Sequence, residues 1–326
     1  AHRRQRQMCI RDSFKMSKKS DNSLPLLEDR LSLFKLNKID RDIFTWTGES
    51  VGWARIFGGQ VMAQTLIAAY QTIEKKHLAH SFHGYFLRPG QMDKPIVFDV
   101  DRIRDGRSFS TRRVRAIQDG EAIFNSSISF QKREKGLTHQ IDMPEVPGPE
   151  GLLNEWQHRK KISHKIDKKY LPMFLREREI EMRPVEDQDF LNPKKAPPYK
   201  NTWMKPDGLM PKDEKIHQAL LLYASDMGLL GTANNPHGLN FMSPLLQSAS
   251  LDHATWFHGK LDFSDWLLYH IDSPVSGNAR GFSRGSIYNK KGQLVASCVQ
   301  EGLMRLWDKP KPVSYTHLTL PTMRLV

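Results

Sequence analysis

The first part of the chain predicts one helix followed by four strands. Residues 58–73 predict a helix, because apolar side chains recur every three or four positions, at Met62, Leu66, Ala69, Tyr70 and Ile73. Strand-like runs follow at 80–87, 96–104, 109–118 and 122–132. The last run alternates most regularly between apolar and polar residues, which is typical of a strand with one buried face.

The second part of the chain repeats this order of elements. Residues 216–230 are apolar almost all round, which predicts a buried helix. Four strand-like runs again follow, at 247–258, 266–272, 281–288 and 294–306, and candidate opening strands of the two parts lie at 44–47 and 180–185. A faint match supports a duplication: Arg107-Ser-Phe aligns with Arg280-Gly-Phe, and residues 123–129 align with 294–300.

We therefore expect two similar halves in one α+β chain, each an antiparallel sheet with a long helix. The first half spans 14–132 and the second 177–308, and the polar, proline-containing segment 133–176 is predicted to link them. A length of 326 residues exceeds the usual single domain and agrees with a duplication.

The two ends of the chain look foreign to the fold. Residues 3–13 and 313–322 read as translations of a sequencing adapter on opposite strands. We expect 1–13 and 313–326 not to be native, and Met16 to be the native start.

Composition and charge narrow the function classes. No apolar run approaches the roughly 18 residues of a membrane span. With Cys9 in the adapter-like segment, Cys298 stands alone, so neither an internal disulfide nor a cysteine metal site is expected. The net charge of +13 favours a polyanionic partner such as a nucleic acid, an anionic membrane surface or coenzyme A. Six arginines fall within 14 residues, and a solvated strand face is the structural alternative for them: Arg102, Arg104, Arg107, Arg112, Arg113 and Arg115.

Two polar residues stand out in apolar surroundings. Asp226 lies near the end of the predicted buried helix, where an ionised carboxylate is costly unless it is hydrogen-bonded. Gln300 shares a strand face with Leu294, Ala296 and Cys298, so it should have a buried partner. A frayed helix end is the structural alternative for Asp226.

Other candidate motifs have simpler explanations. A G-x-S-x-G pattern surrounds Ser283, but hairpin-like residues follow it instead of the helix that a nucleophile elbow requires. Histidines recur without a metal-binding pattern, and packing along strands explains them better: His80, His83, His253 and His258. Walker and dinucleotide-binding patterns are absent.

Seven segments, in order across most of residues 25–306, closely resemble the type II acyl-CoA thioesterases, bacterial and peroxisomal. They are GGQVMAQ, HSFHGYFLRPG, IRDGRSFSTRRVRAIQ, YASD, SLDHATWFH, ARGFSRG and VQEGLMR. The resemblance implies a double-hotdog fold, in which each sheet wraps around its helix, and hydrolysis of acyl-CoA to free fatty acid and CoA without a cofactor or metal.

The resemblance also implies a catalytic set of Asp226, Ser250 and Gln300, which orient a water molecule. By the repeat alignment, the first half carries Ala68, His80 and Ser129 at these places and is expected to be catalytically silent. Uncovered N–H groups at Gly58 and Gly59 are candidates for binding the oxyanion. Candidates for the CoA phosphates are Arg107, Arg112, Arg113 and Arg280.

The resemblance further implies a homodimer or larger homo-oligomer, in the cytoplasm, or in peroxisomes if the source is eukaryotic. We expect no nucleic-acid partner, because a set of Asp226, Ser250 and Gln300 has no purpose there. Two alternatives remain open: an acyl-CoA hydratase or dehydratase on the same fold, and a non-catalytic CoA-binding module.

Overall fold

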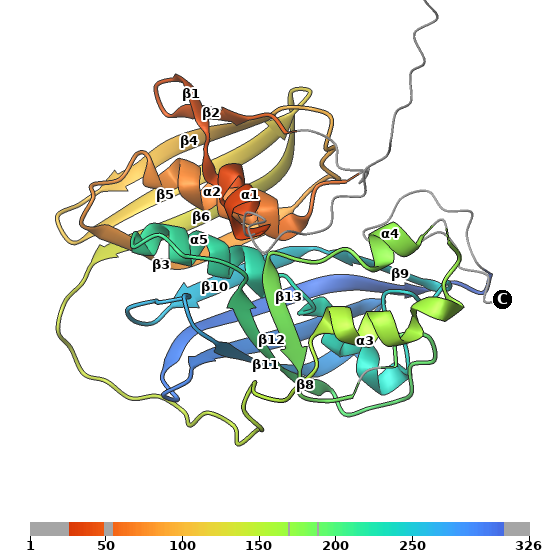
Figure 1. Cartoon of the computed structure of the whole chain (residues 1–326). Helices are drawn as coiled ribbons and strands as arrows, with labels where there is room; N and C mark the ends of the chain where they lie inside the picture. The colour runs from red at the N-terminus through yellow and green to blue at the C-terminus, as the bar shows by residue number, and fades with distance from the viewer. Residues whose placement is uncertain (1–25, 49–54, 169, 188, 310–326) are drawn as a thin grey trace, which may run out of the picture.

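The computed structural model describes residues 26–48, 55–168, 170–187 and 189–309. Figure 1 shows two lobes, with the strands of each lobe curved around a long helix. The segments predicted to be adapter-derived, 1–13 and 313–326, and the predicted native start, Met16, lie outside the described residues.

The N-terminal half contains the first long helix and six strands. Helix α2 spans Gly58–Tyr70, and every residue in it is buried. The strands are β1 (Asn37–Asp40), β2 (Ile43–Trp46), β3 (His77–Phe86), β4 (Ile96–Asp105), β5 (Phe109–Gln118) and β6 (Glu121–Lys132). A short helix, α1 (Leu26–Leu31), and a 3-10 turn at Ser32–Phe34 precede them.

The C-terminal half repeats the pattern with helix α5 (Glu214–Ser225). The Asp213 side chain caps this helix by accepting a hydrogen bond from the Lys215 N–H. A 3-10 helix, η3 (Leu230–His237), follows. The strands are β7 (Ile180–Pro184), β8 (Tyr199–Pro206), β9 (Leu246–Ser250), β10 (Asp252–Phe257), β11 (Leu267–Gly277), β12 (Arg280–Asn289) and β13 (Leu294–Leu306).

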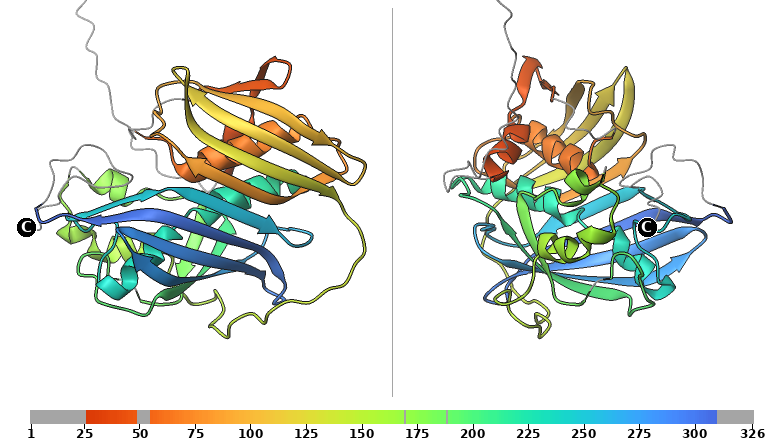
Figure 2. Two further views of the ribbon diagram at one scale, coloured as in Figure 1. Left: turned by 180° about the vertical axis from the view of Figure 1, so that it is seen from behind. Right: turned by 45° about the vertical axis from the view of Figure 1, so that its right-hand side comes forward.

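All strands join one antiparallel sheet, in the order β1-β2-β4-β5-β6-β3-β10-β13-β12-β11-β8-β7, with β9 paired to β13. The halves meet where β3 pairs with β10, so the sheet continues from one lobe into the other. Figure 2 shows this from behind, with the first half above the second.

Helices α2 and α5 pack against each other on the inner side of the sheet. They run antiparallel, because Gly59 at the start of α2 contacts Asp226 at the end of α5, while Tyr70 near the end of α2 donates to Gln218 near the start of α5. The large apolar core includes residues of both helices and both halves of the sheet. The predicted α+β double-hotdog arrangement is confirmed.

Some elements differ from the sequence prediction. Strands β1 and β8 were not predicted. The run at 247–258 is two strands, because its register against β13 shifts by one residue between Ser250 and Ala254; from Asp252 onward it also pairs with β3.

The predicted linker also contains helices, α3 (Glu155–Ile162) and α4 (Leu171–Phe174). Its residues Met143, Val146 and Leu152 pack on a second apolar cluster on the outer side of the sheet, which includes Trp203 and Trp266. None of the helices in the described ranges is long and apolar enough to cross a membrane.

Candidate active site

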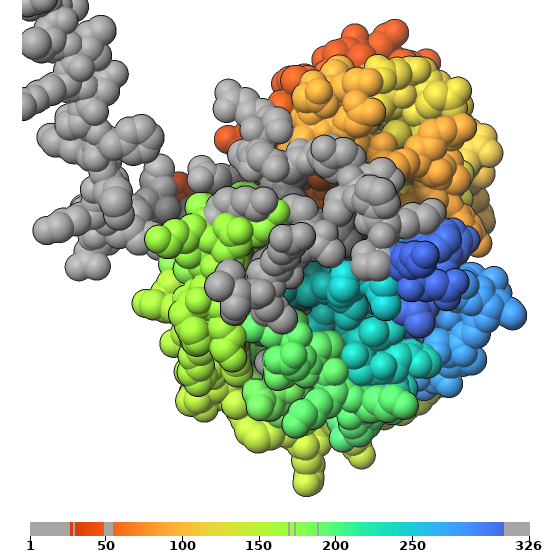
Figure 3. Space-filling view, turned by 90° about the vertical axis from the view of Figure 1, so that its right-hand side faces the viewer, coloured from red at the N-terminus to blue at the C-terminus, as the bar shows by residue number. Residues whose placement is uncertain are grey.

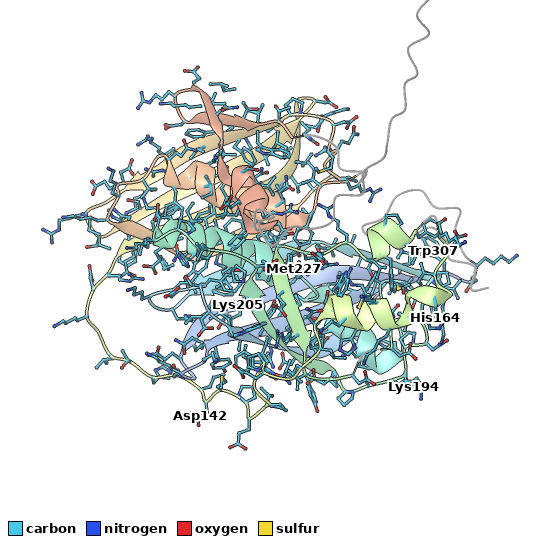
Figure 4. All side chains as sticks on the ribbon, in the orientation of Figure 1. Asp142, His164, Lys194, Lys205, Met227 and Trp307 are labelled. Carbon is cyan, nitrogen blue, oxygen red and sulfur yellow. The ribbon has the colours of Figure 1, made fainter. Side chains whose placement is uncertain are left out.

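The carboxylate of Asp226 lies at the junction of the two long helices. Asp226 is the C-cap residue of α5. Its Oδ2 accepts a hydrogen bond from the Gly59 N–H at 2.9 Å, and its Oδ1 accepts one from Gln300 Nε2 at 2.8 Å. Figure 4 labels the next residue, Met227, which lies near the centre of the molecule where α5 ends. Both oxygens of a single carboxylate are therefore held, one by each half of the chain.

Glycine is required at the start of α2 because the two helices approach closely there. A Cβ on Gly58 would lie 2.9 Å from Asp226 Oδ2 and 2.9 Å from the Phe86 ring. A Cβ on Gly59 would overlap the backbone oxygen of Tyr223. The Gly-Gly pair thus allows a backbone N–H to reach the carboxylate directly.

The surroundings of Asp226 favour a carboxylate that accepts protons readily. Burial raises the pKa of Asp226, and the hydrogen bonds from Gln300 and Gly59 oppose this rise without cancelling it. The positive end of the α2 helix dipole stabilises the ionised carboxylate and therefore acts in the same direction as these hydrogen bonds. A buried carboxylate with a raised pKa is suited to general base catalysis.

Gln300 is completely buried on the inner face of β13. Its Nε2 donates to Asp226, while its Oε1 has no hydrogen-bond donor among the described residues. Buried amide oxygens normally have a partner, so this oxygen is available to a hydrogen of a bound molecule.

Ser250 lies near this pair, although no hydrogen bond joins it to them. It is paired with Gly302, two residues from Gln300 on the same strand, so its side chain is on the same sheet face as Gln300. Within the described part of the chain, its hydroxyl bonds neither Asp226 nor Gln300. The structure thus brings Asp226 and Gln300 into contact and places Ser250 beside them.

His253 is a residue of the site that the sequence interpretation assigned to packing. It is fully buried opposite Gln300, and its Nδ1 is 3.2 Å from Gln300 Nε2. A sequence signal was present, since alternation along β10 places His253 and Thr255, both polar, on the buried face with Phe257.

The pattern around Ser283 has no catalytic geometry. Residues 281–285 lie inside β12, so no strand-to-helix turn exposes the serine. The Ser283 hydroxyl is buried opposite Gln300 and has no hydrogen-bond partner in the described residues. No base in the part of the chain that the structure describes activates it, and the interpretation of this segment as a strand is confirmed. The described residues also contain no group of three side chains that could hold a metal ion.

The repeat alignment pairs Gln300 with Ser129, but the structure places these two residues on opposite faces. Around this position in β6 the buried residues are Ser126, Ile128 and Phe130, and Ser129 is partly exposed on the outer face. There it bonds His80, which lies in a β-bulge of β3, at 2.7 Å. The alignment is thus wrong by one residue, and such a slip reverses the face of every side chain in a strand.

Arg112 is a structural residue. Its side chain is 1% exposed, and its guanidinium donates to the Thr72 side chain and backbone, to the backbone oxygens of Arg104 and Thr111, and to Asp105. With these donors engaged, it has none to offer a phosphate.

The other three candidate arginines lie on the surface. Arg113 pairs with Asp101 and Arg280 with Glu301, each at 2.8 Å, while Arg107 has no ion pair with any described residue. Arg280 is next to Gly281, which lies level with Gly302 and Ser250 in the sheet.

Arg107 is remote from Asp226 by strand register. Phe109, two residues from Arg107, lies level with Leu78 near the start of β3. Phe86, at the end of β3, contacts Gly58, which lies beside Asp226. The separation along β3 is roughly 25 Å at about 3.3 Å per residue.

Figure 3 shows the face where the orange and yellow first half meets the green and blue second half.

Comparison with known proteins gives matches across both halves. Residues 172–303 match the family described as acyl-CoA thioesterase, and residues 49–131 match the acyl-CoA thioesterase N-terminal domain. The chain is 39% identical to acyl-CoA thioesterase 2 of Haemophilus influenzae over 86% of this chain and 98% of that protein. It is 34% identical to human acyl-coenzyme A thioesterase 8 over 84% of this chain and 88% of that protein.

Comparison with solved structures also gives an acyl-CoA thioesterase, and further chains with the same fold. The acyl-CoA thioesterase II TesB2 of Mycobacterium marinum superimposes with a TM-score of 0.70 at 36% identity, covering 85% of this chain and 98% of that one. A protein with a hot dog fold from Alicyclobacillus acidocaldarius superimposes with a TM-score of 0.67 over 84% and 96% of the two chains. Its 18% identity supports the fold alone.

Proposed function

The chain belongs to the acyl-CoA thioesterase family, and we propose that Asp226, Gln300 and Ser250 are the residues with which it hydrolyses acyl-CoA to free fatty acid and CoA. The observation that carries the proposal is the contact between Asp226 and Gln300. It joins a carboxylate of raised pKa to a buried amide whose oxygen has no donor among the described residues.

In the proposed reaction, a water molecule donates one hydrogen to Asp226 and the other to Gln300 Oε1. Asp226 takes the first proton as the water oxygen attacks the thioester carbonyl carbon. Ser250, on the same sheet face, supplies a further hydroxyl to orient this water. The C–S bond then breaks, and the leaving thiolate receives the proton from Asp226, so that acid and thiol form without a covalent enzyme intermediate.

The developing oxyanion is assigned to Gly58. The Gly59 N–H is already engaged with Asp226, whereas the Gly58 N–H has no acceptor among the described residues. At a helix N-terminus this group is suited to a negative oxygen. The two glycines thus have different roles: Gly59 holds the base and Gly58 binds the substrate oxygen.

For the CoA phosphates, we propose Arg280, which lies one residue along β12 from the level of Ser250. Its side chain is exposed on the opposite, outer face of the sheet beside Glu301. Replacing Arg280 by Ala should raise KM and leave kcat unchanged. Arg107→Ala, at the far end of the sheet, is the matched control. Equal effects of the two changes would contradict the assignment.

We further propose a homodimer or larger homo-oligomer, located in the cytoplasm or, in a eukaryotic source, in peroxisomes. A related yeast protein is named a peroxisomal acyl-coenzyme A thioester hydrolase. Light scattering tests the assembly, and a species of only 37.7 kDa would contradict it.

Product analysis separates hydrolysis from the two alternatives. The purified protein is incubated with acyl-CoA and enoyl-CoA substrates of several chain lengths, and free thiol is measured together with the acid. Stoichiometric thiol and acid support hydrolysis. Conversion of enoyl-CoA without thiol release indicates a hydratase, and binding without turnover indicates a CoA-binding module.

A further inference from the structure

A chain of buried polar groups continues from Gln300 through His253 to Ser225, the residue before Asp226. His253 Nε2 is 3.0 Å from Ser225 Oγ and 3.1 Å from Thr255 Oγ1. All three side chains are completely buried. Polar groups in such a position are costly unless each donor meets an acceptor, so the hydrogen-bond directions along this chain are restricted.

These restrictions fix the tautomer of His253. The Gln300 amide nitrogen can only donate, so His253 Nδ1 must be the acceptor in the 3.2 Å contact between them. The proton of the neutral ring is therefore on Nε2. Ser225 Oγ can receive it, because its own hydrogen is donated to the Leu222 backbone oxygen at 2.9 Å. Burial lowers the pKa of His253 to about 3, which keeps the ring neutral.

The same restrictions fix the orientation of the Gln300 amide. Its two N–H hydrogens meet two acceptors, Asp226 Oδ1 and His253 Nδ1. If the amide were turned over, its oxygen would face the Asp226 carboxylate and that contact would become repulsive, so Asp226 sets the orientation and the acceptor at His253 Nδ1 adds to it. The correct orientation leaves Oε1 as the one amide atom without a partner among the described residues.

We propose that His253 is a positioning residue for hydrolysis, which holds the Gln300 amide so that its oxygen faces the attacking water and its nitrogen faces Asp226. The inference rests on the proposed function of Asp226 and Gln300. It gives His253 no part in proton transfer. Its effect is transmitted through Gln300, because Asp226 alone leaves the second amide hydrogen, and hence the amide, less restrained.

Two substitutions of His253 test this role, since each retains one end of the ring. His253→Asn keeps an acceptor near the place of Nδ1, and His253→Gln keeps a donor near the place of Nε2. We expect His253→Gln to lower kcat by about 10- to 100-fold, the usual cost of misplacing a catalytic group, with KM unchanged. His253→Asn should stay within about threefold of the parent, because it still holds Gln300.

Coupling to Gln300 distinguishes positioning from general damage to the fold. In a Gln300→Ala background, His253→Gln should have no further effect on kcat. Equal losses in both backgrounds, or equal losses for His253→Asn and His253→Gln, would overturn the inference. Loss of activity in Asp226→Asn together with normal kcat in His253→Gln would refute the role of His253 alone. Normal turnover in Asp226→Asn would refute the proposed function itself.

A measurement on the unaltered protein covers the case in which a variant does not fold. Histidine labelled with 15N reports by NMR which ring nitrogen carries the proton. We expect the Nε2–H form of His253, unchanged across the pH range of activity. An Nδ1–H form, or protonation within that range, would contradict the inference.

Discussion

If Asp226 and Gln300 act as one unit, removing either side chain should lower kcat, and removing both should cost little more. Asp226→Asn removes the base and should reduce kcat by about 10²- to 10⁴-fold. Gln300→Ala removes one hydrogen bond to a charged group, worth about 1.5–3 kcal/mol, which corresponds to about 10- to 150-fold. The double variant should match Asp226→Asn within a few-fold, since residues that act together are not additive.

The structure offers a matched control for this experiment. Ser283 lies directly opposite Gln300 and is equally buried, but its hydroxyl has no partner among the described residues. Ser283→Ala should leave kcat within a few-fold, and it should not lower the melting temperature, because no hydrogen bond is lost.

The assay is free-thiol release at saturating acyl-CoA, with KM measured for each variant. KM should stay within about twofold, because Asp226 and Gln300 stabilise the transition state more than the bound substrate. Near-normal turnover in Asp226→Asn would refute the role of the carboxylate. A collapse of turnover in Ser283→Ala alone would restore Ser283 as a nucleophile.

Three further predictions concern pH, packing and the chain ends. Burial raises the pKa of Asp226, and only the ionised carboxylate accepts a proton, so kcat should fall as the pH drops through a value above the ordinary carboxyl range. A pH–rate profile tests this. His253, with a pKa of about 3, should add no step to the profile near neutral pH. Arg112→Met should lower the free energy of unfolding in urea by roughly 2–4 kcal/mol, because a buried network loses its donors, whereas Arg113→Met on the surface should cost less than about 1 kcal/mol. Deleting residues 1–13 and 313–326 should change neither melting temperature nor kcat, and a marked loss of either would show that these segments contribute to the fold.

Much of the fold could be predicted from the sequence, because its pattern is local. Periodicity within a single segment predicts the helix at 58–73 and the strands at 96–104, 109–118 and 294–306. Strand β8 (Tyr199–Pro206) was missed for a physical reason. Both of its faces are covered, by the main core at Met204 and by the linker at Trp203, so it shows no alternation of apolar and polar residues.

The site was only partly visible in the sequence. Asp226 and Gln300 could be singled out, because each is a polar residue in an apolar segment, and that conflict is itself a local signal. His253 carried a weaker signal of the same kind, which packing among strand aromatics explained equally well. The register error at Ser129 shows the limit of alignment by eye, since a shift of one residue exchanges the two faces of a strand.

The sequence by itself showed that Asp226 and Gln300 are polar residues in segments expected to be buried. It therefore determined that these two side chains need hydrogen-bond partners. Only the tertiary structure decided what those partners are. The antiparallel packing of α2 on α5 brings the Gly59 N–H to Asp226, across 167 positions of sequence, and the pairing of β10 with β13 brings His253 to Gln300. The same folding encloses Arg112 among Thr72 and Asp105, while Arg113, its neighbour in sequence, faces solvent. Hydrogen bonds of this kind join segments that are distant in the chain, and no local periodicity specifies them.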